Sequence, residues 1–170
     1  MGPGSTSVLF DTCIGWMGLE SSPVGITKVI LPQKSREAVL SNLRSHQCFS
    51  QSRGLVSFGD LPQRIKSHLA GEPVDFPDIV DLSEGSLFQR SVWEIVRTIP
   101  YGETSTYARI ASQIRSRDSA RAVGQALARN PVPIIIPCHR VISNNGDIGG
   151  FSGGLELKRF LLKIEGTDVK

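Results

Sequence analysis

Residues 130–141 read Asn-Pro-Val-Pro-Ile-Ile-Ile-Pro-Cys-His-Arg-Val, the most constrained stretch of this 170-residue chain. Its three prolines fix their own φ and bias each preceding residue toward extended geometry, so the backbone has few conformations available. Its three isoleucines favour burial. The stretch then presents a thiol, an imidazole and a guanidinium in direct succession, at Cys138, His139 and Arg140. This pattern predicts a rigid apolar support that displays a nucleophile.

A thiol attacks well only as the thiolate, so Cys138 needs a base or a positive field nearby. His139 is the nearest candidate base, although adjacent residues of an extended chain point to opposite sides and a water could be needed between them. An acid must then orient the imidazole, and Glu165, Asp147 and Glu156 are all candidates. The alternative is structural, because a cysteine in an apolar run is more often a packing residue. Spacing alone leaves both interpretations open.

Composition sets the broad class of the protein. Hydrophobic residues make up 39% and charged residues 21% of the chain, values typical of a soluble domain with a core. The net charge of +3 permits a nucleic-acid partner without requiring one. No stretch approaches the ~18 apolar residues of a membrane span, and the N-terminus lacks the features of a signal peptide. We therefore expect a cytoplasmic protein with no membrane partner.

The three cysteines are odd in number and far apart, so they predict no disulfide framework. A single bridge between Cys13 and Cys48 stays open as an alternative. Together with His46 and His68, these two cysteines are the only soft ligands of the first half, and their spacing matches no zinc cluster. The sequence therefore predicts no bound metal.

The chain changes character near residues 75–85, which predicts two domains, 1–80 and 81–170. The first is rich in Val and Ile with turn residues between the runs, and the second has apolar stripes at helical spacing. We expect strands at 8–11, 15–20 and 25–31, the last closed by Pro32, and helices at 34–45 and 62–70. In the second domain we expect helices through 88–99, 107–114, 120–127 and 157–164. Overall the pattern predicts a mixed fold of the α/β (α+β) class.

Three short helices in succession, the last two close together, suggest a helix-turn-helix. Asp118 or Ser119 would cap the third helix. The outer face of that helix combines small residues with two arginines and an amide, a surface that can approach a DNA groove closely. A solvated helix face is the plainer interpretation. The residues of this face are Arg121, Ala122, Gln125, Ala126 and Arg129.

The string Pro137-Cys138-His139-Arg140-Val141 resembles the active-site signature of the O6-alkylguanine-DNA alkyltransferases, or methylated-DNA–protein-cysteine methyltransferases. The resemblance extends over residues 87–166, and its motifs occur in the order of the family. The other matching motifs are Phe88, Val92-Trp93, Ile99-Pro100-Tyr101-Gly102, Thr106-Tyr107, Ala120-Arg121-Ala122-Val123-Gly124, Asn130-Pro131, Phe151-Ser152-Gly153-Gly154-Leu155 and Glu165-Gly166.

The resemblance implies a DNA-repair enzyme that accepts the alkyl group of O6-alkylguanine on Cys138. The transfer would be irreversible, with one turnover per molecule and no cofactor, and O4-alkylthymine would be a second candidate substrate. His139 would deprotonate the thiol through a water, and Glu165 would hold the imidazole. Asn130 would order the active-site turn. The chain would act as a monomer on double-stranded DNA.

The resemblance also implies that the damaged base is flipped out of the duplex. Tyr107 would push the phosphate of the target nucleotide and donate toward the flipped base. Arg121 would fill the gap from a helix in the minor groove, while Val141 and Ser152 would read the extruded guanine. The other expected DNA or base contacts are Ala122, Gln125, Ala126, Arg140 and Gly153.

For the first domain the resemblance implies a ribonuclease-H-like fold, although few identities support it there. Phe151 stands where the family usually has an aromatic residue, often tyrosine. Its ring keeps the stacking surface without the hydroxyl group.

Two other function classes fit parts of the sequence. A cysteine hydrolase could use Cys138 and His139 as nucleophile and base, but it would need an oxyanion hole and would turn over repeatedly. A DNA-binding module without catalysis, either a regulator or a damage sensor, would explain the third helix. The alkyltransferase-like sensors lack the acceptor cysteine that this chain has at Cys138, which disfavours that class.

Overall fold

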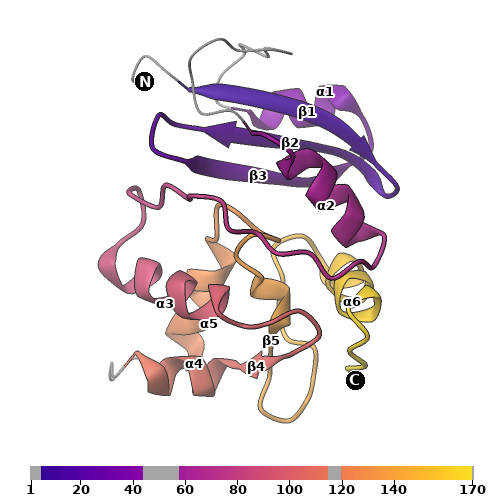
Figure 1. Ribbon diagram of the computed structural model, residues 1–170. Coiled ribbons are helices and arrows are strands. Elements are labelled where there is room, and N and C mark those ends of the chain that lie inside the picture. Colours follow the sequence, from indigo (N-terminus) through magenta and orange to yellow (C-terminus); the bar gives the residue numbers. More distant parts are fainter. Residues whose placement is uncertain (1–4, 44–57, 115–119, 170) are drawn as a thin grey trace. The chain divides into compact units, whose positions relative to one another are not determined.

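The computed structural model describes residues 5–43, 58–114 and 120–169 of the chain (Figure 1). The chain divides into two compact units, Met1–Leu82 and Ser83–Lys170. The first unit is built on a sheet and the second mainly on helices, so the mixed α/β class expected from the sequence is confirmed. No helix among the described residues combines the length and apolar character needed to cross a bilayer.

The first unit contains a three-stranded antiparallel sheet in the order β1-β2-β3. Its strands are β1 (Thr6–Thr12), β2 (Gly15–Ser21) and β3 (Ile26–Gln33). The expected end of the third strand at Pro32 is wrong, because β3 continues through it. The pairing of β3 with β2 is irregular at this point, between the pairs Trp16–Gln33 and Gly18–Ile30, and a proline is tolerated at such a bulge.

Two helices accompany this sheet. Helix α1 (Arg36–Asn42) begins where the Ser35 side chain accepts a hydrogen bond from the Ala38 N–H, two residues later than expected. Its Val39 packs with Ile30 of the sheet. Helix α2 (Leu61–Leu69) starts with a proline in its first turn, as helix starts commonly do.

The connector after α2 is fastened by an ion-pair cluster. The guanidinium of Arg64 donates to both carboxylate oxygens of Asp78, at 2.7 and 2.9 Å, and to Asp60 at 2.9 Å. It also lies 5.8 Å from the ring centre of Phe76. A bidentate arginine–carboxylate pair has a well-defined geometry, so it gives this otherwise irregular segment a fixed course.

The described part of the second unit contains four helices, two short strands and one turn of 3-10 helix. Helices α3, α4 and α5 pack against one another (Figure 1). Their apolar sides supply buried residues such as Val92, Ile110 and Val123. In chain order the elements are α3 (Leu87–Arg97), β4 (Ser105–Thr106), α4 (Tyr107–Gln113), α5 (Ala120–Ala128), η1 (Cys138–Arg140), β5 (Val141–Ile142) and α6 (Leu155–Ile164).

Helix α3 has a complete capping box at its start. Ser86 Oγ accepts from the Gln89 N–H at 3.2 Å, while the Gln89 side chain accepts from the Ser86 N–H at 2.9 Å. Further along, the indole N–H of Trp93 donates to the Ala126 carbonyl at 2.9 Å and joins α3 to α5. The cap therefore fixes the start of the helix against which α5 packs.

The two short strands connect the start of α4 with the segment after Cys138. They pair in parallel, with Ser105 opposite Val141 and Thr106 opposite Ile142. Thr106 then caps α4, because its side chain accepts from the Arg109 N–H at 3.2 Å. The pairing fixes the first residue of α4, Tyr107, close to the turn that carries Cys138.

Several predictions fall on residues outside the described ranges. The link between α4 and α5 includes residues 115–119, so the expected cap at Asp118 or Ser119 and the turn of the helix-turn-helix stay predictions. The same holds for the bridge between Cys13 and Cys48 and for any ligand role of His46.

We expect Ser86→Ala to lower the free energy of unfolding by about 1 kcal/mol, because the Gln89 N–H at the start of α3 loses its capping partner, the Ser86 hydroxyl. Urea denaturation followed by circular dichroism measures this change. Ser91→Ala, within the same helix, is the matched control and should leave stability unchanged or slightly raised, since alanine is the better helix former. Equal midpoints for the two variants would contradict the capping role.

Candidate active site

The loop before Cys138 is organised by the side chain of Asn130. Its Nδ2 atom donates to the Ile136 carbonyl at 2.9 Å and to the Cys138 sulfur at 3.2 Å. Its Oδ1 atom accepts from the Val132 N–H at 3.0 Å. One buried amide thus closes the loop at both ends and holds the sulfur, as expected from the sequence for a residue that orders this turn.

Within this loop Ile134 adopts φ +75°, the only positive φ of a non-glycine residue among the described ranges. A β-branched residue is strained in the left-handed region, at a typical cost of ~1–3 kcal/mol. The side chain is 1% exposed, and the Ile136 N–H donates to the Val132 carbonyl at 2.9 Å. Burial and hydrogen bonding therefore hold a backbone shape that the chain would otherwise avoid.

The nucleophile itself lies in a turn. Residues 138–140 form one turn of 3-10 helix, in which the Arg140 N–H donates to the Pro137 carbonyl at 2.9 Å. Cys138 and His139 were expected to lie in an extended chain with their side chains on opposite sides. That expectation was wrong, because both residues lie in the turn. Pro137 starts the turn because its missing N–H loses nothing there.

The imidazole of His139 is held by Glu165, the residue that ends α6. The distance from His139 Nε2 to Glu165 Oε1 is 2.8 Å, and both side chains are fully buried. Arg140 donates to the same carboxylate from Nε at 2.9 Å and from Nη2 at 3.0 Å. One carboxylate therefore binds two consecutive residues of the turn.

The structure distinguishes between the three acids left open by the sequence. Asp147 accepts from its near neighbour Asn145 at 2.6 Å. Glu156 is exposed and lies 3.9 Å from Arg159 on the same helix. Only Glu165, of these three, is hydrogen-bonded to His139.

Arg140 was expected to contact DNA, but the structure places it in the interior of the second unit. Its residue is 6% exposed, and its third nitrogen, Nη1, donates to the Ile99 carbonyl at 2.6 Å. The guanidinium also lies 5.9 Å from the ring centre of Tyr101. All three guanidinium nitrogens are therefore engaged inside the protein, and two of them, Nε and Nη2, hold Glu165.

The protonation states follow from burial and from these hydrogen bonds. Burial opposes charge on Glu165, but hydrogen bonds from His139 and Arg140 outweigh it and lower the pKa of Glu165 to about 2. Burial lowers the pKa of His139, even though Glu165 acts in the opposite direction. Burial raises the pKa of the Cys138 thiol, while Asn130 and the charge of Lys158 favour the thiolate. At neutral pH the resting site holds a carboxylate, a neutral imidazole and a thiol.

A cavity of about 630 Å³ opens beside Cys138. A cavity of this volume is in the range of small-molecule sites and can hold a nucleobase. Five residues singled out from the sequence share its wall with Cys138: Tyr107, Arg121, Gln125, Phe151 and Ser152. The chain therefore brings a nucleophile, aromatic rings and hydrogen-bonding groups to one hollow.

Tyr107 is fitted into this wall by a glycine. A Cβ atom on Gly149 would lie 2.8 Å from the Tyr107 hydroxyl oxygen, and Gly149 also has φ +69°. Both facts require glycine at that position. The Tyr107 hydroxyl donates to the Gly150 carbonyl at 3.4 Å, which aligns the ring along the loop.

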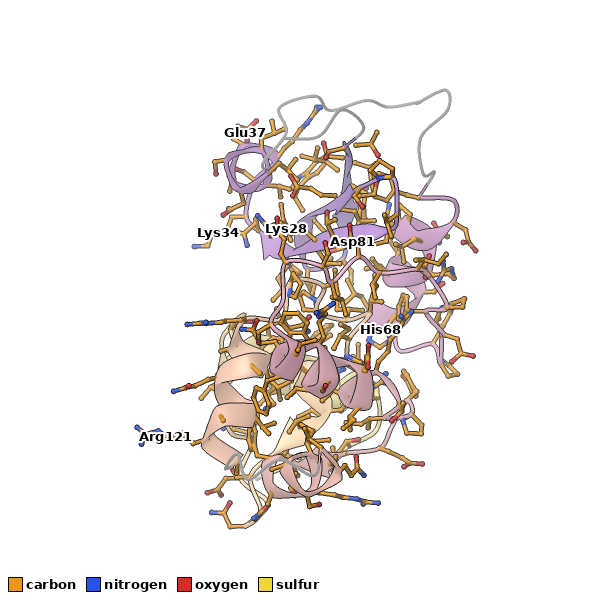
Figure 2. The ribbon with its side chains drawn as sticks, turned by 90° about the vertical axis from the view of Figure 1, so that its left-hand side faces the viewer. Lys28, Lys34, Glu37, His68, Asp81 and Arg121 are labelled. Atoms are coloured by element: carbon orange, nitrogen blue, oxygen red, sulfur yellow. The ribbon has the colours of Figure 1, made fainter. Side chains whose placement is uncertain are left out.

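Helix α5 presents only part of its expected face. Arg121 and Gln125 are exposed, and Figure 2 shows the Arg121 side chain pointing away from the helix. Ala122 is partly buried, and neither it nor Gly153 lines the cavity. The expectation that Ala126 lies on the exposed face is wrong, because it is 3% exposed and follows the buried Val123 by one turn.

Val141, expected to contact the base, is fully buried beside the site and does not line the cavity. Its carbonyl accepts a hydrogen bond from Lys158 Nζ at 2.7 Å. Lys158, a fully buried lysine of α6, was not predicted from the sequence as a residue near the site. Its spacing carried a signal, because it precedes the apolar Leu162 and the site residue Glu165 by four and seven residues on one side of the helix.

Comparison with known proteins supports one family across the chain. Residues 87–167 match the family described as "6-O-methylguanine DNA methyltransferase, DNA binding domain". The methylated-DNA–protein-cysteine methyltransferase of Mycolicibacterium paratuberculosis is 42% identical over 150 residues, 85% of this chain and 88% of that protein. The methylated-DNA–protein-cysteine methyltransferase of Sulfolobus acidocaldarius is 38% identical over 156 residues, which are 90% of this chain and 94% of that protein.

A solved structure agrees with these sequences. The crystal structure of Mycobacterium tuberculosis OGT in complex with DNA has a TM-score of 0.74 and 36% identity to this chain. The match covers 94% of this chain and 92% of the Mycobacterium tuberculosis chain. The similarity therefore extends over both units, and the chain belongs to the methylated-DNA–protein-cysteine methyltransferase family.

Proposed function

We propose that this protein repairs DNA by moving the alkyl group of O6-alkylguanine onto Cys138, once per molecule. The observation that carries the proposal is the position of the sulfur. It lies in the wall of a cavity that can hold a base, next in sequence to an imidazole bonded to a buried carboxylate. Membership of the family supports the reaction class.

His139 serves as the base in this proposal. Its Nε2 atom is bonded to Glu165, so Nδ1 is the nitrogen that takes the thiol proton, directly or through a water. The thiolate then forms a bond to the alkyl carbon while the bond from that carbon to guanine O6 breaks. The departing guanine leaves as an anion and takes up the proton that the imidazolium of His139 gives back, directly or through a water, and Glu165 stabilises the imidazolium in the interval. The thioether product has no route back, so each chain acts once.

DNA recognition in this proposal uses the exposed part of α5. A base inside a duplex cannot present its O6 group to a protein cavity, so it must be flipped out. Arg121 and Gln125 are exposed and line the cavity mouth, which suits a minor-groove helix whose arginine fills the gap. With α4, this helix would form the helix-turn-helix.

The remaining contacts complete the base site. Tyr107, fixed at the start of α4, lies where it can press on the target phosphate and donate to the flipped base. Ser152 lines the cavity and is suited to reading the edge of the guanine. Val141 and Gly153 do not line it, so the contacts expected from them stay predictions. Arg140, in contrast, is assigned to holding Glu165.

We expect incubation with duplex DNA containing one O6-methylguanine to add the mass of one methylene group to the protein. Intact-mass spectrometry and peptide mapping should place it on the peptide of Cys138 and stop at one per chain. Cys138→Ala should gain no mass yet bind the DNA as before. Tight binding to the lesion without a mass gain in the wild-type protein would identify a damage sensor, and repeated turnover of a small ester substrate would identify a hydrolase.

Arg121→Ala should slow repair of duplex DNA by about tenfold, equivalent to ~1.4 kcal/mol of lost stabilisation of the flipped state. The same variant should react with free O6-benzylguanine at the wild-type rate, because that substrate needs no flipping. Arg159→Ala, an exposed arginine of α6, controls for the change in net charge. Equal losses with duplex and free base would contradict the role in flipping.

The rate with free O6-benzylguanine should be level near neutral pH and fall in acid. Only neutral His139 accepts the thiol proton, and its pKa is below the ordinary 6.5, so the loss of rate begins below that pH.

Glu165→Gln should slow the reaction by roughly 10²-fold, the lower end of general-base contributions, because the imidazolium loses its counter-charge.

Glu156→Gln, an exposed carboxylate of the same helix, is the control for Glu165→Gln and should react normally. A folded Glu165→Gln protein with the wild-type rate would refute the assignment of the His139–Glu165 pair.

A further inference from the structure

The turn between β5 and the cavity wall carries an asparagine followed directly by a glycine, Asn145-Gly146. This is the only Asn-Gly pair in the sequence. Asn145 is exposed, and Gly146 adopts φ +84° with no atom within 4 Å of the position that a Cβ would take. The backbone nitrogen of Gly146 is therefore next to no side chain of its own residue, and open space adjoins its Cα.

The side chain of Asn145 is folded over this glycine. Its Oδ1 atom accepts from the Asp147 N–H at 3.2 Å, and its Nδ2 atom donates to the Asp147 carboxylate at 2.6 Å. In such an Asx turn the side-chain carbonyl bonds to the backbone two residues on. The side-chain carbon Cγ is therefore held on the Gly146 side of Asn145, which suits attack by the Gly146 nitrogen on the side-chain amide.

The other three asparagines of the sequence lack this combination. Asn130 precedes Pro131, whose nitrogen carries no proton to lose. Asn42 and Asn144 precede residues that have a Cβ atom, which crowds the backbone nitrogen. Asn145 is thus the position where the sequence and the turn favour the same reaction.

We propose that Asn145 is a site of spontaneous deamidation with isoaspartate formation, and that the modified turn slows the reaction at Cys138. The modification itself does not depend on the proposed function, whereas its effect on alkyl transfer rests on that function.

The modification needs no reagent except water. The hydrogen bond from the Gly146 N–H to the Ser143 carbonyl, 3.0 Å long, opens first. The Gly146 nitrogen then loses its proton and bonds to Cγ of Asn145, while the bond from Cγ to Nδ2 breaks and ammonia leaves with a proton from the solvent. Water adds to the succinimide at either carbonyl carbon. Breaking the bond from nitrogen to Cγ gives aspartate, and breaking the bond to the main-chain carbonyl carbon gives isoaspartate.

The turn connects two parts of the cavity wall. Ser143 lines the cavity before the turn, and residues 149–152 line it afterwards. The Ser143 N–H donates to the Asp147 carbonyl at 2.9 Å, so the turn sets the spacing of these parts. The wall also has little room to shift, because a Cβ atom on Gly149 would lie only 2.8 Å from the Tyr107 hydroxyl oxygen.

Both products disturb this turn. Deamidation replaces the Nδ2 donor, 2.6 Å from the Asp147 carboxylate, with a carboxylate oxygen, so that two negative groups meet where a hydrogen bond was. Isoaspartate also lengthens the backbone by one methylene group, because the chain then runs through the side-chain carbons. We therefore expect the larger displacement of residues 149–152 from isoaspartate.

The first measurement follows the whole chain during incubation at mildly alkaline pH and physiological temperature. Peptide mapping by mass spectrometry detects the conversion of an amide to a carboxyl group, and electron-transfer fragmentation distinguishes isoaspartate from aspartate. We expect both products at Asn145, with isoaspartate in excess, while Asn144 stays an amide. Asn145→Gln should also stay an amide, because its longer side chain forms a cyclic imide much more slowly. An unmodified Asn145, after an incubation that fully converts a synthetic peptide of residues 141–149, would overturn the proposal.

The second measurement is the rate with free O6-benzylguanine. Ion-exchange chromatography separates the modified protein, which carries one more negative charge, and circular dichroism confirms that it is folded. We expect the isoaspartate form to react about tenfold more slowly, a smaller loss than the ~10²-fold that a 1 Å misplacement can cause. Asn145→Asp carries the charge without the longer backbone and should lose less. Asn144→Asp makes the same charge change at the neighbouring exposed position and should react as the parent does.

Folded isoaspartate protein that reacts at the parent's rate would overturn the effect on alkyl transfer. An unmodified parent that fails to react with O6-benzylguanine would instead count against the proposed function, and the peptide map would still decide whether Asn145 is modified.

Discussion

The carboxylate of Glu165 is the group on which the order of the active site depends. It lies at the end of α6, where the helix dipole disfavours a negative charge, and it is buried. Arg140 supplies the compensating positive charge through two hydrogen bonds to it. Burial, with a smaller contribution from the charge of Arg140, lowers the pKa of His139, so it can be bonded to an anion and still be neutral. A base is thereby kept available that a simple histidine–carboxylate pair would tend to protonate.

The surrounding backbone has little freedom to relax, which suits a site that must be ready before its substrate arrives. Asn130 bonds to both ends of the loop, and Ile134 is held in a strained conformation by its burial. The β4–β5 pairing then fixes Tyr107 relative to the same turn. Strain of this kind persists only where several interactions determine one shape, and here the loop, the strand pair and α6 all meet at residues 138–141.

The sequence allowed the chemistry to be predicted better than the contacts. Cys138 and His139 drew attention because prolines and isoleucines around them leave few conformations, but only the family resemblance favoured a nucleophile over a packing residue. The identity of the acid could not be settled, since pairing across 26 residues depends on how α6 packs. Arg140 was misplaced because a guanidinium looks the same in sequence whether it meets a phosphate or a carboxylate. Lys158 was missed because charged residues are normally assigned to the solvent side of a helix.

A buried thiol with a raised pKa has a further consequence under the proposed function, in which each molecule acts once. The thiol form reacts slowly with stray electrophiles and oxidants, so burial protects a nucleophile that cannot be regenerated. Reactivity must then be created within the site, by a neutral His139 that accepts the proton and by the positive charge of Lys158. Both groups act on the sulfur from fixed positions, whereas the alkyl group must enter the cavity to reach it. Under the proposed function, selectivity would come from forming the thiolate mainly where a base in the cavity can use it.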